Sequence, residues 1–279
     1  MKTGIVDVGG GLRGVYAAGV FDYCMDTGMQ FGVGIGVSAG SANVASYCAR
    51  QRGRNYPFYT DYPFRKKFVG LRNMIFKRSY LDLDYIYGIL SNADGENPLD
   101  YNTFVRSPTE FIGVATNAYT GEAKYFDKSS LRQDDYSVLK ASSAIPFICH
   151  PYEVEMVPYF DGALSDPVPV EKAFTMGCSK VVLILTKPKD IPRSVGQDLR
   201  LAKQIEKAYP LAAEKLRTRA ERYNAGVESA KQYEDQGKLL IIAPDDTCGV
   251  DTLTKDRKAL QNFYKKGYED ARRITDFIN

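Results

Sequence analysis

Short apolar segments alternate with amphipathic segments along the first part of the chain, a pattern typical of parallel β-sheets whose strands are joined by helices. Thr3 to Val8 is an apolar run that ends in a glycine-rich loop, and residues 15–21 after it have helical character. A second apolar run, from Phe31 to Val37, leads into a helix with small residues that extends to about Arg52. This β-α-β-α order predicts an α/β fold, a three-layer α/β/α sandwich with a mainly parallel central sheet.

The remainder of the chain continues this pattern less regularly. Residues 55–97 are rich in tyrosine and predict only short helical pieces. No linker is clear enough to cut the chain, so we expect a single domain over residues 1–279, with a motif-bearing core over about 4–190 and a helical extension with one further strand over about 195–279. The other predicted elements are strands at 109–116, 122–126, 152–157, 159–160, 180–186 and 238–243, a turn at Pro158, and helical regions at 134–143, 195–236 and 255–278.

The composition changes this picture little. With 44% hydrophobic and 25% charged residues, the chain has the composition of an ordinary soluble globular protein. A net charge of +3 is small for 279 residues and argues against wholesale binding of nucleic acid. Five scattered cysteines without a C-x-x-C motif favour reduced thiols and a cytoplasmic location, and we expect neither a signal peptide nor a membrane-spanning segment.

The chain contains a single histidine, His150. One imidazole and no cysteine-rich spacing argue against a metal site, and we expect the chemistry to need neither metal nor cofactor. A serine nucleophile in this chain would have to use His150 as its base or work without histidine. The chain order Ser, His, Asp differs from the Ser, Asp, His order of α/β-hydrolases, which favours a structural role for His150 over a catalytic one.

The five residues Gly36-Val-Ser-Ala-Gly40 have the G-x-S-x-G pattern of a nucleophile elbow, a sharp strand-to-helix turn that exposes its serine, here Ser38. The two glycines allow the chain to turn closely on both sides of the serine. The helix that follows directs its N-terminal amides at negative charge developing there. On its own the pattern is weak, because glycine-rich loops contain serine by chance.

Gly9 to Gly14 fits G-x-G-x-x-G between a strand and a helix, as a dinucleotide-binding loop would. That interpretation needs an acidic residue at the end of the second strand, where this chain has Val37 and Ser38. Three successive glycines can instead direct main-chain amides at one point and form an oxyanion hole, and a turn without any ligand is the third interpretation. Arg13 either anchors this loop, attracts an anionic head group or is a solvated surface charge.

Asp161-Gly162-Ala163 follows a strand-like segment, which places the carboxylate of Asp161 at a strand end. Aspartate is a poor base in water because its pKa is about 4, but burial raises the pKa, and each unit adds about 1.4 kcal/mol of proton affinity. A desolvated Asp161 hydrogen-bonded to Ser38 can therefore act as its base. The alternative is an Asp-Gly turn that closes a hairpin.

Three of these blocks occur in the order found in the patatin-like phospholipases, and the chain resembles a bacterial member of that family. The blocks are Gly9–Gly14, Gly36–Gly40 and 161–163, and a softer match at 141–146 resembles an A-S-x-A-x-P segment of the family. The resemblance covers roughly residues 4–170 and implies a patatin-like fold and a Ser-Asp dyad without catalytic histidine. It implies Ser38 as nucleophile, Asp161 as base, the Gly10 and Gly11 amides as oxyanion donors, and Gly9, Leu12, Arg13, Gly14, Gly36, Gly40 and Gly162 as supporting motif residues.

Residues 62–80 hold six lysines and arginines, from Arg65 to Arg78, and no acid. Apolar residues at 64, 68, 71 and 75 share one helical face, and a basic amphipathic helix of this kind can lie on an anionic membrane surface. Peripheral contact with an anionic membrane through Arg65 to Arg78 is therefore one interpretation of the segment. A core-facing helix with a solvated basic side explains the pattern slightly better, and a nucleic-acid patch is the third interpretation.

The sequence as a whole predicts a serine acyl hydrolase of the lipase or phospholipase A type, which cleaves fatty-acyl esters of lipids through an acyl-enzyme. Three alternatives stay open: an acyltransferase that uses the same dyad, a nucleotide-binding module that uses the glycine loop, and a lipid-binding protein without catalytic activity. The sequence does not indicate the head group, the acyl-chain length or the positional preference.

Overall fold

Eight strands form one mixed sheet in the computed structural model, which describes residues 1–70 and 79–278. The strands are β1 (Thr3–Asp7), β2 (Val33–Val37), β3 (Glu110–Asn117), β4 (Ala123–Phe126), β5 (Tyr152–Val154), β6 (Val157–Asp161), β7 (Lys180–Ile184) and β8 (Leu239–Ile242). The α-helices are α1 (Val15–Asp26), α2 (Ala39–Cys48), α3 (Tyr56–Thr60), α5 (Tyr101–Arg106), α6 (Ser137–Ser142), α7 (Val170–Thr175), α8 (Gly196–Ile205), α9 (Pro210–Arg217), α10 (Arg219–Asp235), α11 (Arg257–Asp270) and α12 (Arg273–Ile278). Short 3-10 turns lie at Gly11–Gly14, Tyr62–Phe64, Lys128–Ser130 and Gly162–Leu164, and a π-helical turn lies at Tyr85–Ile89.

The parallel part of the sheet runs in the order β3-β2-β1-β7-β8. β4 and β6 both pair with the far end of β3 in the antiparallel sense, and β5 extends β6 as a hairpin. β1, β2 and β7 are almost continuously buried, because both faces of the sheet are covered.

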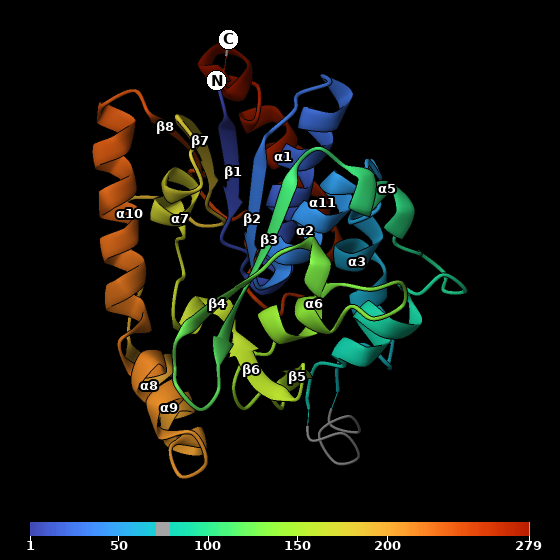
Figure 1. Cartoon of the computed structure of the whole chain (residues 1–279), viewed down its shortest axis with the longest axis vertical. Helices are drawn as coiled ribbons and strands as arrows, with labels where there is room; N and C mark the ends of the chain where they lie inside the picture. The colour runs from blue at the N-terminus through green and yellow to red at the C-terminus, as the bar shows by residue number, and fades with distance from the viewer. Residues whose placement is uncertain (71–78, 279) are drawn as a thin grey trace.

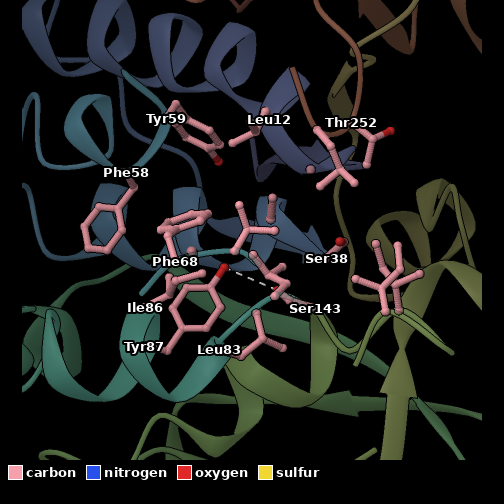
Figure 2. Close-up of a pocket in the computed structure, with 18 of the residues that line it drawn as sticks. Leu12, Ser38, Phe58, Tyr59, Phe68, Leu83, Ile86, Tyr87, Ser143 and Thr252 are labelled. Carbon is pink, nitrogen blue, oxygen red and sulfur yellow. Dashed lines mark hydrogen bonds between the residues drawn. The ribbon is translucent and has the colours of Figure 1, made fainter. Parts of the chain in front are cut away.

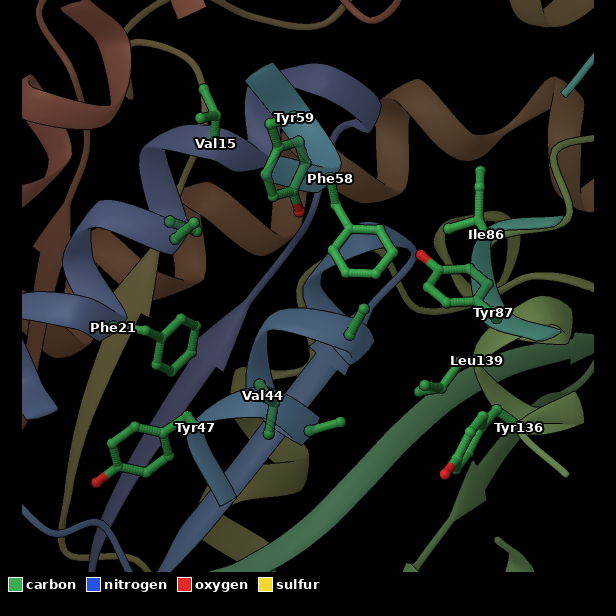
Figure 3. Packing of buried hydrophobic residues seen from close by; sticks show 14 of the residues in the cluster. Val15, Phe21, Val44, Tyr47, Phe58, Tyr59, Ile86, Tyr87, Tyr136 and Leu139 are labelled. Atoms are coloured by element: carbon green, nitrogen blue, oxygen red, sulfur yellow. The ribbon is translucent and has the colours of Figure 1, made fainter. Parts of the chain in front are cut away.

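Helices cover both faces of the sheet, which makes the molecule the three-layer α/β/α sandwich that the sequence predicts (Figure 1). α1, α2 and α11 cover one face, and α7 and α10 cover the other. The first face has the larger core, in which aromatic side chains from α1, α2, α3 and the segment around Tyr87 interlock (Figure 3). α11 packs on α1 at very short distance, since Cβ atoms at Gly19 and Gly267 would overlap the main chain of the opposite helix.

Most predicted elements form with ends shifted by a few residues. The two strands predicted over 109–126 pair as the expected antiparallel hairpin, and the last helical region divides into α11 and α12. The elbow helix is shorter than predicted, because α2 ends at Cys48 rather than near Arg52. The helix predicted at 134–143 begins later, at Ser137.

Two predictions are wrong in detail. The turn predicted at Pro158 lies instead at Glu155 and Met156. Their φ angles of 51° and 63° are positive, as a two-residue hairpin turn requires. Glutamate and methionine rarely adopt such angles, so the sequence does not indicate a turn there. Pro158 lies within β6. The helical region 195–236 is three helices rather than one, because Pro210 has no N–H to continue a helix and starts α9.

The basic amphipathic helix considered over residues 62–80 falls partly outside the described residues, which omit 71–78. Its described part is not helical, since Phe64 ends a 3-10 turn, Arg65 is extended and Val69 forms an isolated bridge with Leu81. Phe68 is buried in the core. Within residues 1–70 and 79–278, no helix combines the length and apolar character needed to cross a bilayer.

Candidate active site

The serine of the G-x-S-x-G pattern occupies a sharp turn between β2 and α2. β2 ends at Val37 and α2 begins at Ala39, which leaves Ser38 in the turn with φ 57° and ψ −132°. Holding a residue other than glycine in such a conformation costs on the order of 1–3 kcal/mol. Gly40 is required beside it, because a Cβ there would overlap the main chain of Asp7. The structure thus forms the strand-to-helix turn that the pattern predicts.

The loop after β1 contains three consecutive glycines and passes close to this turn. Gly9, Gly10 and Gly11 have positive φ angles of 67°, 131° and 60°. A Cβ on Gly9 would collide with the carbonyl oxygen of Val37, so the loop lies directly against the turn. Within the described part of the chain the N–H groups of Gly10 and Gly11 have no acceptor, and both glycines line a cavity together with Ser38. Unused main-chain donors beside a serine are what an oxyanion hole requires.

Strand register brings Asp161 to Ser38. On one edge of β3, Val114 pairs with Val37 at the end of β2, and the next residue, Ala115, pairs with Asp161 at the end of β6. β2 and β6 therefore end at neighbouring positions, which they reach from opposite directions. Ser38 and Asp161 line the same cavity, and a hydrogen bond from Ser38 contributes to the pKa of the Asp161 carboxyl.

The carboxyl of Asp161 is buried, and burial raises its pKa above the ordinary value for aspartate. Hydrogen bonds oppose this rise: the N–H of Ala163 donates to Oδ1 at 2.8 Å, and Ser38 donates as well. The positive charges of Arg219 and Arg193 also lower the pKa. Burial is the largest of these effects, so the carboxylate is a stronger base than aspartate in water.

The softer sequence match before Asp161 connects the two residues. The hydroxyl of Ser142 accepts a hydrogen bond from the N–H of Ser38 at 3.0 Å and donates one to the carbonyl of Val114 at 2.6 Å. Two residues later, the carbonyl of Ala144 accepts from the N–H of Asp161 at 2.9 Å. This segment therefore fixes the main chain at both Ser38 and Asp161.

A second buried carboxylate, Asp7, holds the glycine loop against α2. Its Oδ1 accepts from the N–H of Gly9 at 2.8 Å, and its Oδ2 accepts from Nδ2 of Asn43 at 2.9 Å. Asn43 also donates to the carbonyl of Gly14 at 3.1 Å and accepts from the hydroxyl of Tyr59 at 3.0 Å. Burial raises the pKa of Asp7 to about 6, although both hydrogen bonds oppose the rise.

Replacing Asp7 with asparagine is expected to change how stability depends on pH. Because the pKa of Asp7 in the folded protein is about 6 and that of an unfolded aspartate is about 4, the folded state binds this proton more tightly. The resulting stabilisation is fully present below about pH 4 and is lost as the pH rises through about 6. Urea unfolding should therefore show that the stability of the wild type relative to Asp7→Asn falls by about 2–3 kcal/mol between pH 4 and 7. Asp94→Asn, at an exposed position, is the matched control. A difference between wild type and Asp7→Asn that is independent of pH would contradict the assignment.

The glycine loop is also held by a segment far along the chain. The N–H of Leu12 donates to the carbonyl of Thr252 at 3.0 Å, and a Cβ on Gly11 would lie 2.7 Å from the same carbonyl. Nη1 of Arg13 donates to Asp251 at 2.6 Å and to the hydroxyl of Thr252 at 2.9 Å. Arg13 therefore anchors the loop, one of the roles that the sequence left open.

Two cavities of different character meet at Ser38. One, of about 110 Å³, is lined mainly by apolar side chains, and Figure 2 shows Ser38 at its edge with Phe58, Phe68 and Ile86 among its walls. The other, of about 380 Å³, contains Asp161 and the glycine loop and is lined by several charged side chains. A substrate with an apolar chain on one side of its reactive carbon and a polar group on the other fits this arrangement.

The remaining motif glycines serve close packing. A Cβ on Gly36 would overlap the main chain of Ser41, and a Cβ on Gly162 would overlap the carbonyl of Val114. Both glycines thus allow main-chain segments to approach on either side of the Ser38–Asp161 pair.

His150 does not join this group. Its Nδ1 lies 2.8 Å from the hydroxyl of Ser79, and its ring stacks on Tyr152 with centroids 4.4 Å apart. It lines neither of the cavities that contain Ser38. These contacts agree with the structural, non-catalytic role that the sequence favours for His150.

Three contributors to the site were not indicated as such by the sequence. Asp7 carries a detectable signal, a charged residue at the end of an apolar run immediately before the glycine loop. Ser142 lies in the 141–146 segment, which resembles a segment of the family, but the sequence assigns no function to this serine. Thr252 carries no local signal, because its contact with the loop depends on the tertiary fold.

Comparisons with known proteins show which families parts of the chain match. Residues 8–174 match the family described as patatin-like phospholipase, and residues 209–278 match a domain of unknown function, DUF6363. The chain is 28% identical over 205 residues to the uncharacterized protein YjjU of Escherichia coli strain K12, a match that covers 68% of this chain and 53% of YjjU. The chain thus spans about half the length of this curated relative.

The fold is similar to that of VipD from Legionella pneumophila, whose crystal structure superposes with a TM-score of 0.50 at 16% identity over 99% of this chain and 67% of VipD. This likeness supports the fold alone. The patatin-like phospholipase match covers more than half of the chain and includes the glycine loop, the elbow and Asp161. The chain therefore belongs to the patatin-like phospholipase family.

Proposed function

We propose that the protein is a serine acyl hydrolase that cleaves fatty-acyl esters of lipids, with Ser38 as nucleophile and Asp161 as base. The observation that carries this proposal is the strand register that sets the two residues side by side where an apolar cavity meets a polar one. Family membership supports a lipid acyl hydrolase as the class of enzyme.

The reaction has two halves. Ser38 Oγ attacks the ester carbonyl carbon while Asp161 takes the hydroxyl proton, and the N–H groups of Gly10 and Gly11 stabilise the negative oxygen that forms. The carbon–oxygen bond to the alcohol then breaks, and the alcohol leaves with the proton from Asp161. In the second half Asp161 takes a proton from water, the hydroxide attacks the acyl carbon, and Ser38 regains its proton as the fatty acid departs.

An aspartate can do this work without histidine because of its surroundings. Burial raises the pKa of Asp161, so the carboxylate accepts a proton from serine more readily than it would in water. The Ala163 N–H holds one carboxylate oxygen at 2.8 Å, which orients the group. The strained conformation of Ser38 presents its hydroxyl at the cavity rather than in the sheet.

The test is covalent labelling with a fluorophosphonate, which reacts with activated serines. We expect a single labelled peptide containing Ser38, with no labelling of Ser38→Ala and much slower labelling of Asp161→Asn. Ser143→Ala is the matched control, since Ser143 lines the apolar cavity and its hydroxyl lies 3.3 Å from that of Tyr87. Labelling of another serine, or undiminished labelling of Asp161→Asn, would show the assignment to be wrong.

A further inference from the structure

Residues 209–278, which match a domain of unknown function, contribute one segment to the cavities beside Ser38. This segment is the connection between β8 and α11, residues 243–256. Its residues Thr252 and Leu253 line both cavities that contain Ser38, and Asp251 lines the larger one. The proposed reaction gives the connection no function, but its contacts with the glycine loop indicate one.

The glycine loop cannot fix its own conformation. Gly9, Gly10 and Gly11 all have positive φ, and glycine loses more conformational freedom on folding than any other residue. An oxyanion hole requires donors that already point at the place where the negative oxygen forms, to within about 0.5 Å. Contacts from outside the loop therefore have to hold the N–H groups of Gly10 and Gly11.

The loop is held on both sides of these two donors. Before them, the N–H of Gly9 donates to Asp7 at 2.8 Å, and the carbonyl of Gly9 accepts from the hydroxyl of Thr186 at 2.6 Å. After them, the N–H of Leu12 donates to the carbonyl of Thr252 at 3.0 Å. The first anchor comes from β1 and the chain just after β7, and the second comes from the β8–α11 connection.

The same connection also supports each donor glycine from behind. A Cβ on Gly11 would lie 2.7 Å from Cγ2 of Thr252, and a Cβ on Gly10 would lie 3.2 Å from Nη2 of Arg13. Arg13 is 6% exposed, and its Nη1 donates to Asp251 at 2.6 Å and to the hydroxyl of Thr252 at 2.9 Å. The connection thus touches Gly11 directly and reaches Gly10 through Arg13.

We propose that Asp251 and Thr252 are positioning residues for the oxyanion hole, through which the region of unknown function completes the active site. This role rests on the proposed function, in which the N–H groups of Gly10 and Gly11 stabilise the negative oxygen. A displaced donor weakens binding of the transition state more than binding of the ester. Both halves of the reaction form this oxygen, so both slow together and KM changes little.

The first experiment measures kcat and KM of Asp251→Ala and Thr252→Val on p-nitrophenyl butyrate. Asp251→Ala removes the carboxylate that holds Arg13, and Thr252→Val removes the hydroxyl at nearly constant size. We expect each to lower kcat by about tenfold and to keep KM within about twofold, less than the 10²–10³-fold typical of losing an oxyanion donor outright. Thr252→Ser, which keeps the hydroxyl, should retain at least about half of the wild-type kcat.

Asp245→Ala is the matched control. Asp245 lies in the same connection and pairs with Lys266, its side chain is 77% exposed, and it lines neither cavity that contains Ser38. We expect this variant to keep the wild-type kcat.

The second experiment separates positioning from a general loss of structure, by inhibition with a trifluoromethyl ketone of matching chain length. Ser38 Oγ adds to the ketone carbon, its proton passes to Asp161, and the ketone oxygen becomes negative, but no group leaves. The adduct therefore resembles the transition state, and in each variant Ki should rise by the same factor by which kcat/KM falls.

Equal kcat values for Asp251→Ala, Thr252→Val and Asp245→Ala would overturn this proposal and leave the proposed function intact. A loss carried by KM alone, or one that Ki does not follow, would also overturn it, because the connection would then serve substrate binding or folding. A wild type that hydrolyses no ester and is not labelled at Ser38 would contradict the proposed function itself, and this inference with it.

Discussion

Replacing Ser38 with alanine is expected to reduce ester hydrolysis by at least about 10⁴-fold, because no acyl-enzyme can form without the hydroxyl. The substitution removes one oxygen and leaves the hydrogen bond from the main chain of residue 38 to Ser142 in place. The measurement is the initial rate on a chromogenic acyl ester, with thermal unfolding as the check that the variant is folded.

Ser143→Ala provides the comparison for this loss. Ser143 lines the same apolar cavity, so its removal tests whether any cavity serine matters, and we expect it to retain at least about half of the wild-type rate. A folded Ser38→Ala protein with a tenth of the wild-type rate would contradict the role given to Ser38.

Asp161→Asn is expected to slow hydrolysis by about 10²–10⁴-fold, the contribution typical of a general base. Asparagine has the same shape and its oxygen can still accept from the N–H of Ala163, but it cannot take a proton from Ser38. In the proposed mechanism the two residues act as a unit, and the Ser38→Ala/Asp161→Asn double variant should then be no slower than Ser38→Ala. A double variant with much lower activity than either single variant would show independent roles.

The proposed role of Asp161 as base also predicts how activity depends on pH. Asp161 must be ionised to act as a base, so kcat/KM falls as the pH drops through its pKa, which burial raises above the ordinary value near 4. Arg193 lowers this pKa, and Arg193→Gln should therefore move the acid limb of the pH profile to higher pH. The limb should vanish in Asp161→Asn. An acid limb that Arg193→Gln leaves in place would argue that another group controls it.

The parts of the fold that follow local pattern are predictable from the sequence. β1, β2 and β7 are mainly apolar runs, and Gly36 of the G-x-S-x-G turn is required by main-chain contacts with Gly40 and Ser41, only a few residues away. The ordered blocks at the glycine loop, the elbow and Asp161 identify the family because together they are far more specific than any one of them. The described part of residues 55–97 resists prediction because several of its side chains form cavity wall rather than a layer, as Phe58 and Tyr87 illustrate.

The rest of the site depends on contacts that local pattern does not encode. Ser38 and Asp161 meet because β2 and β6 share one edge of β3, a register that the residues of β6 alone do not reveal. In the sequence, Arg193 and Arg219 look like ordinary surface charges, but the fold brings them together at Asp198 from a loop and from α10. The single domain predicted over the whole chain stays a prediction, although β8 joins the sheet and α11 packs on α1.

The contact between the glycine loop and the 251–252 segment has a consequence for biosynthesis. Arg13 and Asp251 are 238 residues apart, and a ribosome that adds about 5–20 residues per second needs roughly 10–50 s to cover that separation. The elbow and its neighbouring strands can fold during this time, but the contact of the glycine loop with Asp251 and Thr252 cannot form. Nascent chains are therefore expected to carry Ser38 in its turn well before the 251–252 segment can fix the glycine loop beside it.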